Sequence, residues 1–420
     1  MNENKVTVID AMMGKGKSSY AIQMMNDAPL YQKFIYITPF LSEVERVLSS
    51  VKNRKFIQPE ASKGKRKKDD LKDLISKGSD IVSTHSLFQK VDDELIELLN
   101  AQGYTLILDE VMNVIEQERI SRDDLKLLLT APTASGEPTL TVKEDGFCQW
   151  NDESYKEGKF INIKRLAESN NLMIYEDKAV YWTMPVEAFK AFDEVYILTY
   201  LFDGQIQRYY YDLFNVQYSY KSVDKVGDRY ELTEYLPLHQ EDRSQLKELI
   251  NIYYPTKTDK TDLNKIGDKR GAFSVTHLNK VTKDADSALI RKMIKDNAYN
   301  FYRNKCKASS ADVMWTTFKD AEKTLAPKNL KKQFVEVTSR ATNDYADKTT
   351  CIYLANRFLN PITAQFFNSK GVKVNEELFA LSELLQWTFR SRIRKGEAVE
   401  VYIPSSRMRG LLEDYLNNEM

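Results

Sequence analysis

Two short stretches of the chain combine residue types that bind phosphate and activate water. The first is AMMGKGKS, residues 11–18, which follows the apolar run VTVI and precedes a segment of helix-forming composition. In such a strand–loop–helix context, glycine amides approach phosphate closely, lysine reaches the terminal phosphates and serine suits Mg²⁺. The alternative is a flexible glycine turn with two solvated lysines. We expect ATP to be bound by Met13, Gly14, Lys15, Gly16, Lys17, Ser18 and Ser19.

The second stretch is YTLILDEVMNVIE, in which Asp109 and Glu110 end an apolar run. A carboxylate at this position can hold Mg²⁺ through its water shell, and the next one can orient or deprotonate the attacking water. Carboxylates also end many strands without any catalytic role. Together with the phosphate loop, the pair predicts a metal site of Ser18 and Asp109, with Glu110 as a catalytic residue.

Composition sets limits on the function. The 420 residues carry 61 basic and 61 acidic side chains, a balance that neither indicates nor excludes nucleic acid. The three cysteines are far apart and the histidines are few, which disfavours a disulfide framework and a zinc site. No long apolar run and no signal-peptide pattern occur, so we expect a soluble cytoplasmic protein without a membrane partner.

One dense basic run, KGKRKK, covers Lys63 to Lys68. We interpret it as a solvated loop ahead of a helix. The alternative is a patch dedicated to phosphate contacts.

The first half of the chain alternates apolar runs with helical segments, which predicts a parallel α/β sheet covered by helices. We expect strands at Lys5–Asp10, Phe34–Thr38, Asp80–Ser83, Thr105–Asp109 and Glu194–Thr199. Between them, NLMIYEDKAVYWT has two β-rich halves around a charged turn and predicts a β-hairpin. The expected first domain is 1–228, with a β-rich insertion at about 138–185.

The second half, 229–420, returns to the same rhythm but contains no phosphate loop of its own. DVMWTT, QFVEV, TCIYLA and AVEVYI are the expected strands, and Glu376–Thr388 is an expected helix. The sequence therefore predicts two α/β domains in tandem with one phosphate loop.

These stretches, in this order, resemble the motifs of superfamily 2 helicases, nucleic-acid motors with two RecA-like domains. AMMGKGKS is similar to motif I, including its alanine, and DEVM to the D-E-x-x box. YITPF, STHSLFQ, LTYLFDGQ, MWTTFKD, TSRATNDY and QWTFRSRIR resemble the remaining motifs in turn. The resemblance covers residues 11 to 394. Compact size and many tyrosines suggest a bacteriophage-type member.

The chain departs from the family pattern at several positions. Phe389 replaces a glycine of the last motif, and Arg390 matches its first arginine. Either Arg392 or Arg394 could supply the second arginine. Thr199 to Leu201 lack the usual small polar pair. Too few residues precede the phosphate loop for the glutamine motif of DEAD-box proteins, which argues against that branch.

The resemblance implies that ATP and Mg²⁺ lie between the domains, with Gln386, Arg390 and Arg394 as catalytic groups from the second domain. It also implies nucleic-acid contacts from Thr38, Pro39, Thr84, His85, Thr316, Thr317 and Arg340. Such residue types satisfy phosphates without reading bases. The alternatives are that Thr38 and Pro39 end a strand and start a helix, and that His85 is a helix-start or core residue.

The expected function is an ATP-dependent DNA helicase or translocase in replication, recombination or repair. DNA, single-stranded or forked, is favoured over RNA as the partner, and replication proteins are further candidate partners. One alternative is an ATP-gated nucleic-acid-binding or loading protein that does not unwind processively. A phage packaging motor would share the loop and acidic pair but needs a nuclease domain that the sequence does not suggest.

Overall fold

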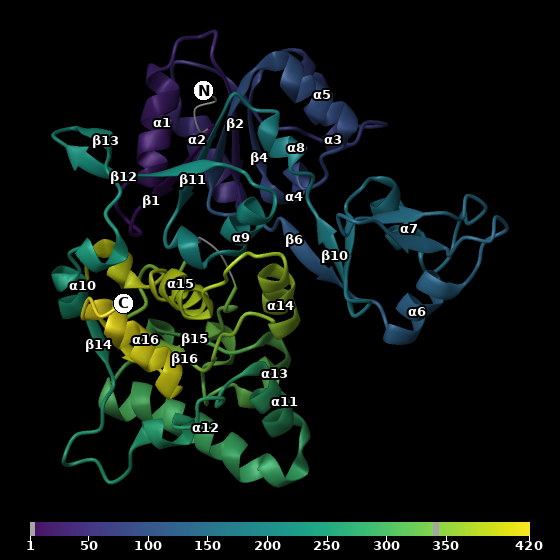
Figure 1. The fold of residues 1–420 in the computed structure, drawn as a ribbon. Coiled ribbons are helices and arrows are strands. Elements are labelled where there is room, and N and C mark those ends of the chain that lie inside the picture. The colour runs from purple at the N-terminus through teal and green to yellow at the C-terminus, as the bar shows by residue number, and fades with distance from the viewer. Residues whose placement is uncertain (1–4, 339–343) are drawn as a thin grey trace. The chain divides into compact units, whose positions relative to one another are not determined.

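The computed structural model describes residues 5–338 and 344–420 (Figure 1). The chain forms two compact units. The first comprises Met1–Ala11, Gly16–Thr233 and Asn360–Val374, and the second comprises Met12–Lys15, Glu234–Leu359 and Asn375–Met420. Both contain parallel sheets with helices, so the predicted α/β class is confirmed.

The first unit is built on an eight-stranded sheet with the order β13-β12-β1-β11-β5-β2-β4-β3. Its strands are β1 Val6–Asp10, β2 Lys33–Thr38, β3 Phe56–Ile57, β4 Asp80–Thr84, β5 Tyr104–Asp109, β11 Glu194–Thr199, β12 Tyr218–Val226 and β13 Arg229–Thr233. All described pairs are parallel except the β12–β13 hairpin. The five strands expected in this half are confirmed, each within one residue of its predicted start and end.

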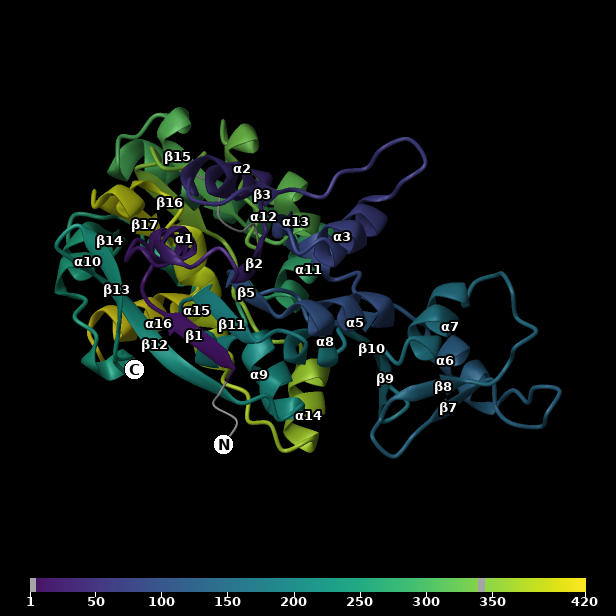
Figure 2. The same ribbon diagram turned by 90° about the horizontal axis from the view of Figure 1, so that it is seen from above.

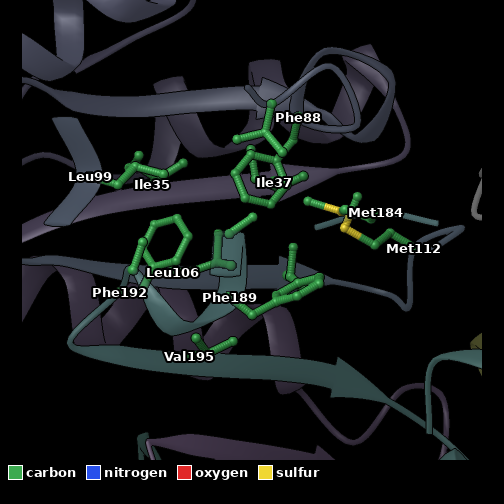
Figure 3. Close-up of a cluster of buried hydrophobic side chains, with 14 of the residues drawn as sticks. Ile35, Ile37, Phe88, Leu99, Leu106, Met112, Met184, Phe189, Phe192 and Val195 are labelled. Atoms are coloured by element: carbon green, nitrogen blue, oxygen red, sulfur yellow. The ribbon is translucent and has the colours of Figure 1, made fainter. Parts of the chain in front are cut away.

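Helices cover both faces of this sheet, as near-continuous apolar strands require. One core places Ala21 and Met25 against Tyr36 and Ile107, and the other places Leu99 against Ile35 and Leu106. Figure 3 shows part of the second core. Figure 2 shows α3 and α5 side by side over it. The helices are α1 Lys17–Asp27, α2 Leu41–Ser50, α3 Lys67–Ser76, α4 His85–Phe88, α5 Asp93–Gln102, α8 Glu187–Lys190 and α9 Ile206–Leu213.

An insertion between β5 and β11 has its own small core. Its elements are β6 Ile115–Glu118, α6 Arg122–Thr130, β7 Leu140–Val142, β8 Cys148–Trp150, α7 Ile161–Glu168, β9 Leu172–Tyr175 and β10 Ala179–Thr183. The predicted hairpin is confirmed as β9–β10, with Glu176 and Asp177 at positive φ in its turn. Strand β6 extends the hairpin to a three-stranded sheet, and β7 pairs with β8. The insertion is therefore a small subdomain rather than a hairpin alone.

A helix from the C-terminal half, α14 (Pro361–Ser369), belongs to the first unit. Its Phe366 stacks on Tyr181 of β10, with ring centroids 4.8 Å apart. Phe367 packs at 5.7 Å from Tyr209 of α9. Because Phe366 and Phe367 are both fully buried, α14 ties the insertion and α9 to a segment more than 150 residues later in the chain.

The second unit has a four-stranded parallel sheet with the order β14-β17-β16-β15. Its strands are β14 Ile250–Ile252, β15 Val313–Thr316, β16 Thr350–Tyr353 and β17 Val399–Tyr402, and its helices are α10 Ser244–Leu249, α11 Val275–Lys283, α12 Ala288–Asn300, α13 Lys319–Leu325, α15 Glu376–Thr388 and α16 Ser406–Leu416. Three expected strands and the helix Glu376–Thr388 are confirmed. The predicted strand QFVEV is wrong, because a 3₁₀ turn runs to Gln333 and only Phe334 bridges to Trp315.

Over the described ranges, every helix is too short or too polar to cross a lipid bilayer.

The packing of α14 gives a stability prediction. Phe366→Ala should destabilise the protein by about 3–5 kcal/mol, because it removes a buried ring and leaves a cavity. Gln365→Ala, at the exposed preceding position, is the matched control and should change stability by less than about 0.5 kcal/mol. Thermal and urea unfolding followed by circular dichroism measure both. Equal stability of the two variants would show that α14 does not hold the insertion.

Candidate nucleotide-binding site

The phosphate loop connects β1 to α1 and uses two glycines in the left-handed region. Gly14 has φ 88° and Gly16 has φ 98°, a conformation that L-residues with a side chain rarely adopt. A Cβ at Gly16 would also lie 2.0 Å from the Cε1 atom of Tyr230 on β13. Gly16 is therefore required by its backbone and by its neighbour. It forms the N-cap of α1, where unpaired amides favour an anion.

Residues at the start of α1 meet the end of β5. The Ser18 hydroxyl donates to Asp109 Oδ1 at 3.1 Å. The Lys17 ammonium is buried and donates to the carbonyl of Ala11, at the beginning of the loop. Arg46 of α2 donates to the Ser19 hydroxyl at 3.3 Å. A cation, a hydroxyl and a carboxylate thus gather around the loop.

The acidic pair sits on the last residue of β5 and the one after it. Burial raises the pKa of Asp109 to about 6, the Glu110 carboxylate adds to this, and the Ser18 hydrogen bond opposes it. Glu110 has φ 72°, and its amide donates to the Leu198 carbonyl of β11 at 2.9 Å. The left-handed conformation of Glu110 costs about 1 kcal/mol.

These donors fit a nucleoside triphosphate with Mg²⁺. Hydroxyl and carboxylate oxygens are hard ligands of the kind that Mg²⁺ prefers, and it commonly takes only one or two from protein. Among residues 5–338 and 344–420, no three His, Cys, Asp or Glu side chains gather as a metal cluster. Ser18 and Asp109 would therefore share the ion with phosphate oxygens and water.

Asp10, the last residue of β1, is part of the site although the sequence did not single it out. Its carboxylate accepts from the amides of Leu201 and Phe202 at 2.9 and 2.8 Å. Leu201 has φ 56°, so Asp10 holds a left-handed turn immediately after β11. Burial raises the pKa of Asp10 to about 7, although both amides and Lys17 oppose the rise. An acidic residue directly before the phosphate loop was the available signal.

Two glutamines also hold the loops around the site and were missed. Gln205 donates to the Thr199 hydroxyl at 2.9 Å and to the Tyr200 carbonyl at 2.7 Å. Gln207 accepts from the amide of Met112, just after the acidic pair, at 2.8 Å. Both glutamines are buried on or beside α9. Gln205 ends the stretch LTYLFDGQ, which was singled out as a motif without a role for its glutamine. Gln207 carried no recognisable pattern, because a buried amide looks like any polar helix residue in a sequence.

The remaining candidate catalytic residues lie in the second unit. Gln386 is half-buried near the end of α15. Arg390 is 3% exposed, with Nη1 3.5 Å from the Glu336 carbonyl. Arg394 is exposed in the 3₁₀ turn Arg392–Lys395, whereas Arg392 Nε donates to the Ala398 carbonyl at 2.5 Å. Of the three arginines, Arg394 is the most exposed residue.

The expected nucleic-acid contacts differ in exposure. Thr38 and Thr84 are register partners at the ends of β2 and β4. Pro39 and Thr84 are half-buried, and His85 is 9% exposed. The side chains of Thr38, Thr316 and Thr317 are fully buried and have no hydrogen-bond partner among the described residues. In this structure the hydroxyls of these three threonines are therefore not presented to a ligand. Arg340 lies outside the described residues.

Comparison with known sequences places the chain in a family. The SPbeta prophage-derived protein YonV of Bacillus subtilis (strain 168) is 40% identical over 99% of both chains. The chain belongs to the YonV family. The model of the YonV middle domain matches residues 115–182, and that of the YonV C-terminal Rossmann-like domain matches residues 244–416. The first of these ranges corresponds to the insertion β6–β10.

Solved structures show more distant likeness. Xpd4 of S. tokodaii is 11% identical, with a TM-score of 0.48 over 98% of this chain and 94% of that one. An apo XPD structure is also 11% identical, with a TM-score of 0.44 over 99% and 95%. At these scores the likeness carries no argument about the function of this YonV-family chain.

The raised pKa of Asp10 gives a pH prediction. A carboxyl with a raised folded-state pKa contributes stability below its unfolded value near 4, and this contribution is lost as pH rises through about 7. The melting temperature of the wild type relative to Asp10→Asn should therefore be higher at pH 5 than at pH 8. Glu45→Gln, at an exposed position on α2, is the control and should show the same difference at both pH values. A pH-independent difference for Asp10→Asn would contradict the assignment.

Proposed function

We propose that this YonV-family protein is an ATP-dependent nucleic-acid motor of the superfamily 2 helicase type, acting on DNA. One observation carries the proposal. The Ser18 hydroxyl of the phosphate loop lies 3.1 Å from the carboxylate of Asp109, so two motifs distant in sequence meet at one edge of a parallel sheet. A flexible glycine turn with solvated lysines would explain neither the contact between Ser18 and Asp109 nor the burial of Lys17 against the Ala11 carbonyl.

Each candidate residue of the phosphate loop and the acidic pair has a role in this proposal. The amides of the loop from Met13 to Ser19 and the Lys17 ammonium would bind the phosphates, and Ser18 and Asp109 would hold Mg²⁺. Bound Mg²⁺ would neutralise phosphate charge. Glu110 would orient the attacking water and accept its proton. Asp10 would position the turn after β11 rather than touch the nucleotide.

The second unit would supply positive charge to the transition state. Gln386, Arg390 and Arg394 are the residues we assign to this role, since a guanidinium at the transferred phosphoryl group contributes about 10³–10⁵ in rate. Hydrolysis would then depend on closure of the two units around ATP. Closure and opening would move the nucleic-acid contacts relative to one another, which is how turnover becomes translocation.

The family membership supports a phage origin, and we propose phage DNA metabolism as the setting. The relative in Bacillus subtilis is prophage-derived, and we extend that origin to this chain. We accordingly propose the cytoplasm of a bacterial host as its location and replication proteins as partners. DNA, single-stranded or forked, is the proposed substrate.

ATP hydrolysis measured with single-stranded, duplex and forked DNA and with RNA tests the proposal. We expect stimulation by single-stranded DNA, together with strand displacement from a fork. Stimulated hydrolysis without displacement from any fork would instead support an ATP-gated binding or loading protein. Absence of ATP hydrolysis with every nucleic acid would overturn the motor assignment.

Substitutions of Lys17 and of Glu110 should differ in their effects on ATP binding and turnover. Lys17→Ala should lower ATP turnover by about 10²–10³-fold and weaken ATP binding, because it removes charge that neutralises phosphate. Glu110→Gln should lower turnover by about 10²–10⁴-fold yet still bind ATP, because the carboxylate acts on water. Hydrolysis assays and equilibrium binding of a fluorescent ATP analogue separate these effects. Near-normal turnover in folded Lys17→Ala would exclude this loop as the site.

The arginine cluster allows a matched comparison. Arg394→Ala should lower turnover by about 10³-fold with little loss of ATP affinity, whereas Arg392→Ala should change it little, since Arg392 donates to the nearby Ala398 carbonyl. Arg390→Ala should act like Arg394→Ala, but Arg390 is buried, so Arg390→Lys and a melting curve must accompany it. A larger effect of Arg392→Ala than of Arg394→Ala would show that the wrong arginine was chosen.

A further inference from the structure

We propose that a pocket between the insertion and the helices of the first sheet binds the ammonium group of a small alkylamine. The pocket lies within the first unit and has a volume of about 330 Å³. The lining residues that carry the proposal are Asp93, Phe147, Ser169, Asn171, Glu187 and Phe214. We refer to it as the Asn171 pocket. None of its described lining residues is assigned above to ATP or to nucleic acid, so the inference goes beyond the proposed function.

Segments that are far apart in the sequence form the walls of the Asn171 pocket. Asp93 lies in the first turn of α5, and Glu187 is the first residue of α8. Phe147 directly precedes β8 and Asn171 directly precedes β9, so both come from the insertion. Phe214 is the C-cap residue of α9. A ligand in the pocket would therefore contact both the insertion and the helices that cover the large sheet.

The side-chain oxygen of Asn171 is buried without a hydrogen-bond partner. Asn171 is 8% exposed, and its Oδ1 atom has no partner among the described residues. The backbone holds the residue in place, because its amide donates to the Leu166 carbonyl at 2.8 Å and its carbonyl accepts from the Thr183 amide at 2.9 Å. A buried carbonyl oxygen without a donor costs free energy that a hydrogen bond recovers. An N–H donor in the pocket that Asn171 lines would supply that bond.

Further acceptors line the Asn171 pocket. Asp93 and Glu187 are carboxylates, and the Ser169 hydroxyl donates its hydrogen to the Arg165 carbonyl at 2.9 Å, so its oxygen presents lone pairs. An ammonium group carries three donors and no acceptor. It therefore matches this set of acceptors better than an alcohol or a carboxylate would.

The charge of the pocket lining is negative. Asp93 takes part in no ion pair among the described residues. Glu187 has Lys190 at 4.0 Å, and because both side chains are exposed this pair is weak. Lys143 donates to Asn170 at 3.5 Å. Neither lysine belongs to the described lining, which thus holds two carboxylates and no cationic side chain.

The apolar part of the pocket indicates that the cation is organic. The rings of Phe147 and Phe214 have centroids 6.1 Å apart and planes inclined by 34°. Aromatic faces attract ammonium ions, and apolar side chains accommodate the methylene stem of an amine. A metal ion would need several hard ligands, and no three His, Cys, Asp or Glu side chains gather in the part of the chain that the structure describes. A volume of about 330 Å³ falls within the roughly 300–1,000 Å³ of small-molecule sites.

Isothermal titration calorimetry of the full chain with n-butylamine hydrochloride tests the Asn171 pocket. The neutral n-butanol, which has the same shape, is the control ligand, and NaCl is added to match the ionic strength. We expect n-butylammonium to bind at least about tenfold more tightly than n-butanol, because only the cation pairs with the carboxylates. Equal affinities would show an apolar cavity that does not recognise charge, and would overturn the proposal.

Substitution of the two carboxylates locates the binding. Asp93→Asn and Glu187→Gln should each weaken n-butylammonium binding about three- to tenfold and leave n-butanol unaffected. Glu97→Gln is the matched control, an exposed carboxylate one turn further along α5 and outside the described lining, and should bind like the wild type. If Asp93→Asn and Glu187→Gln both behave like Glu97→Gln, the amine binds elsewhere and the pocket assignment is wrong.

Asn171→Leu separates recognition of the ligand from support of the fold. Leucine keeps the branched shape and removes the unpartnered oxygen, so the melting temperature without ligand should not fall, whereas n-butylammonium affinity should fall about tenfold. A lower melting temperature with unchanged affinity would make Asn171 a structural residue and overturn its assignment. Tighter binding of a blocked glycine–lysine–glycine peptide than of n-butylammonium would assign the pocket to a protein partner and overturn the small-molecule assignment. These measurements use neither ATP nor nucleic acid, so their outcome is independent of the proposed function.

Discussion

The position of β11 between β1 and β5 is the constraint on which the candidate site depends. In register, Leu198 pairs with Asp109 and Thr199 with Asp10, so one strand end aligns two others. The Thr199 carbonyl accepts from Ala11 at 3.1 Å and the Leu198 carbonyl accepts from Glu110 at 2.9 Å. The start of the phosphate loop and the acidic pair are therefore both held by backbone hydrogen bonds to β11. A shift of β11 by one residue would reverse its faces and separate them.

The site concentrates energetic costs that the surrounding fold must offset. Asp10 and Asp109 are buried carboxyls with raised pKa values, because burial disfavours their charged forms. Leu201 and Glu110 add left-handed backbone at non-glycine residues. These costs are met by two apolar cores, one on each face of the sheet. Strain and burial of this kind gather where ligands and charges act, which is where the sheet edge carries Lys17 and Ser18.

The sequence predicted much of this arrangement because its signals are local. Apolar runs fix strands such as β5, and glycines at 14 and 16 fix the loop, since only their φ values allow its turn. QFVEV has an equally apolar composition, but a 3₁₀ turn runs to Gln333 and only Phe334 bridges to Trp315, so no strand forms there. Asp10 and the docking of α14 were missed because each depends on partners far away in sequence. The burial of Thr38 is likewise decided by packing that composition does not reveal.

The zero net charge of the chain does not conflict with a nucleic-acid partner, because the relevant quantity is local. Phosphate contacts act within a Debye length of about 8–10 Å, so cations elsewhere contribute little. In the run from Lys63 to Lys68, acidic neighbours pair with Lys65, Arg66 and Lys68, whereas Lys63 is exposed and Lys67 lies at a pocket without carboxylates. The net charge of the whole chain does not distinguish paired cations from those without an acidic neighbour. The geometry of the ion pairs distinguishes these cations, so the run interpreted as solvated contains a structural segment at Lys65, Arg66 and Lys68.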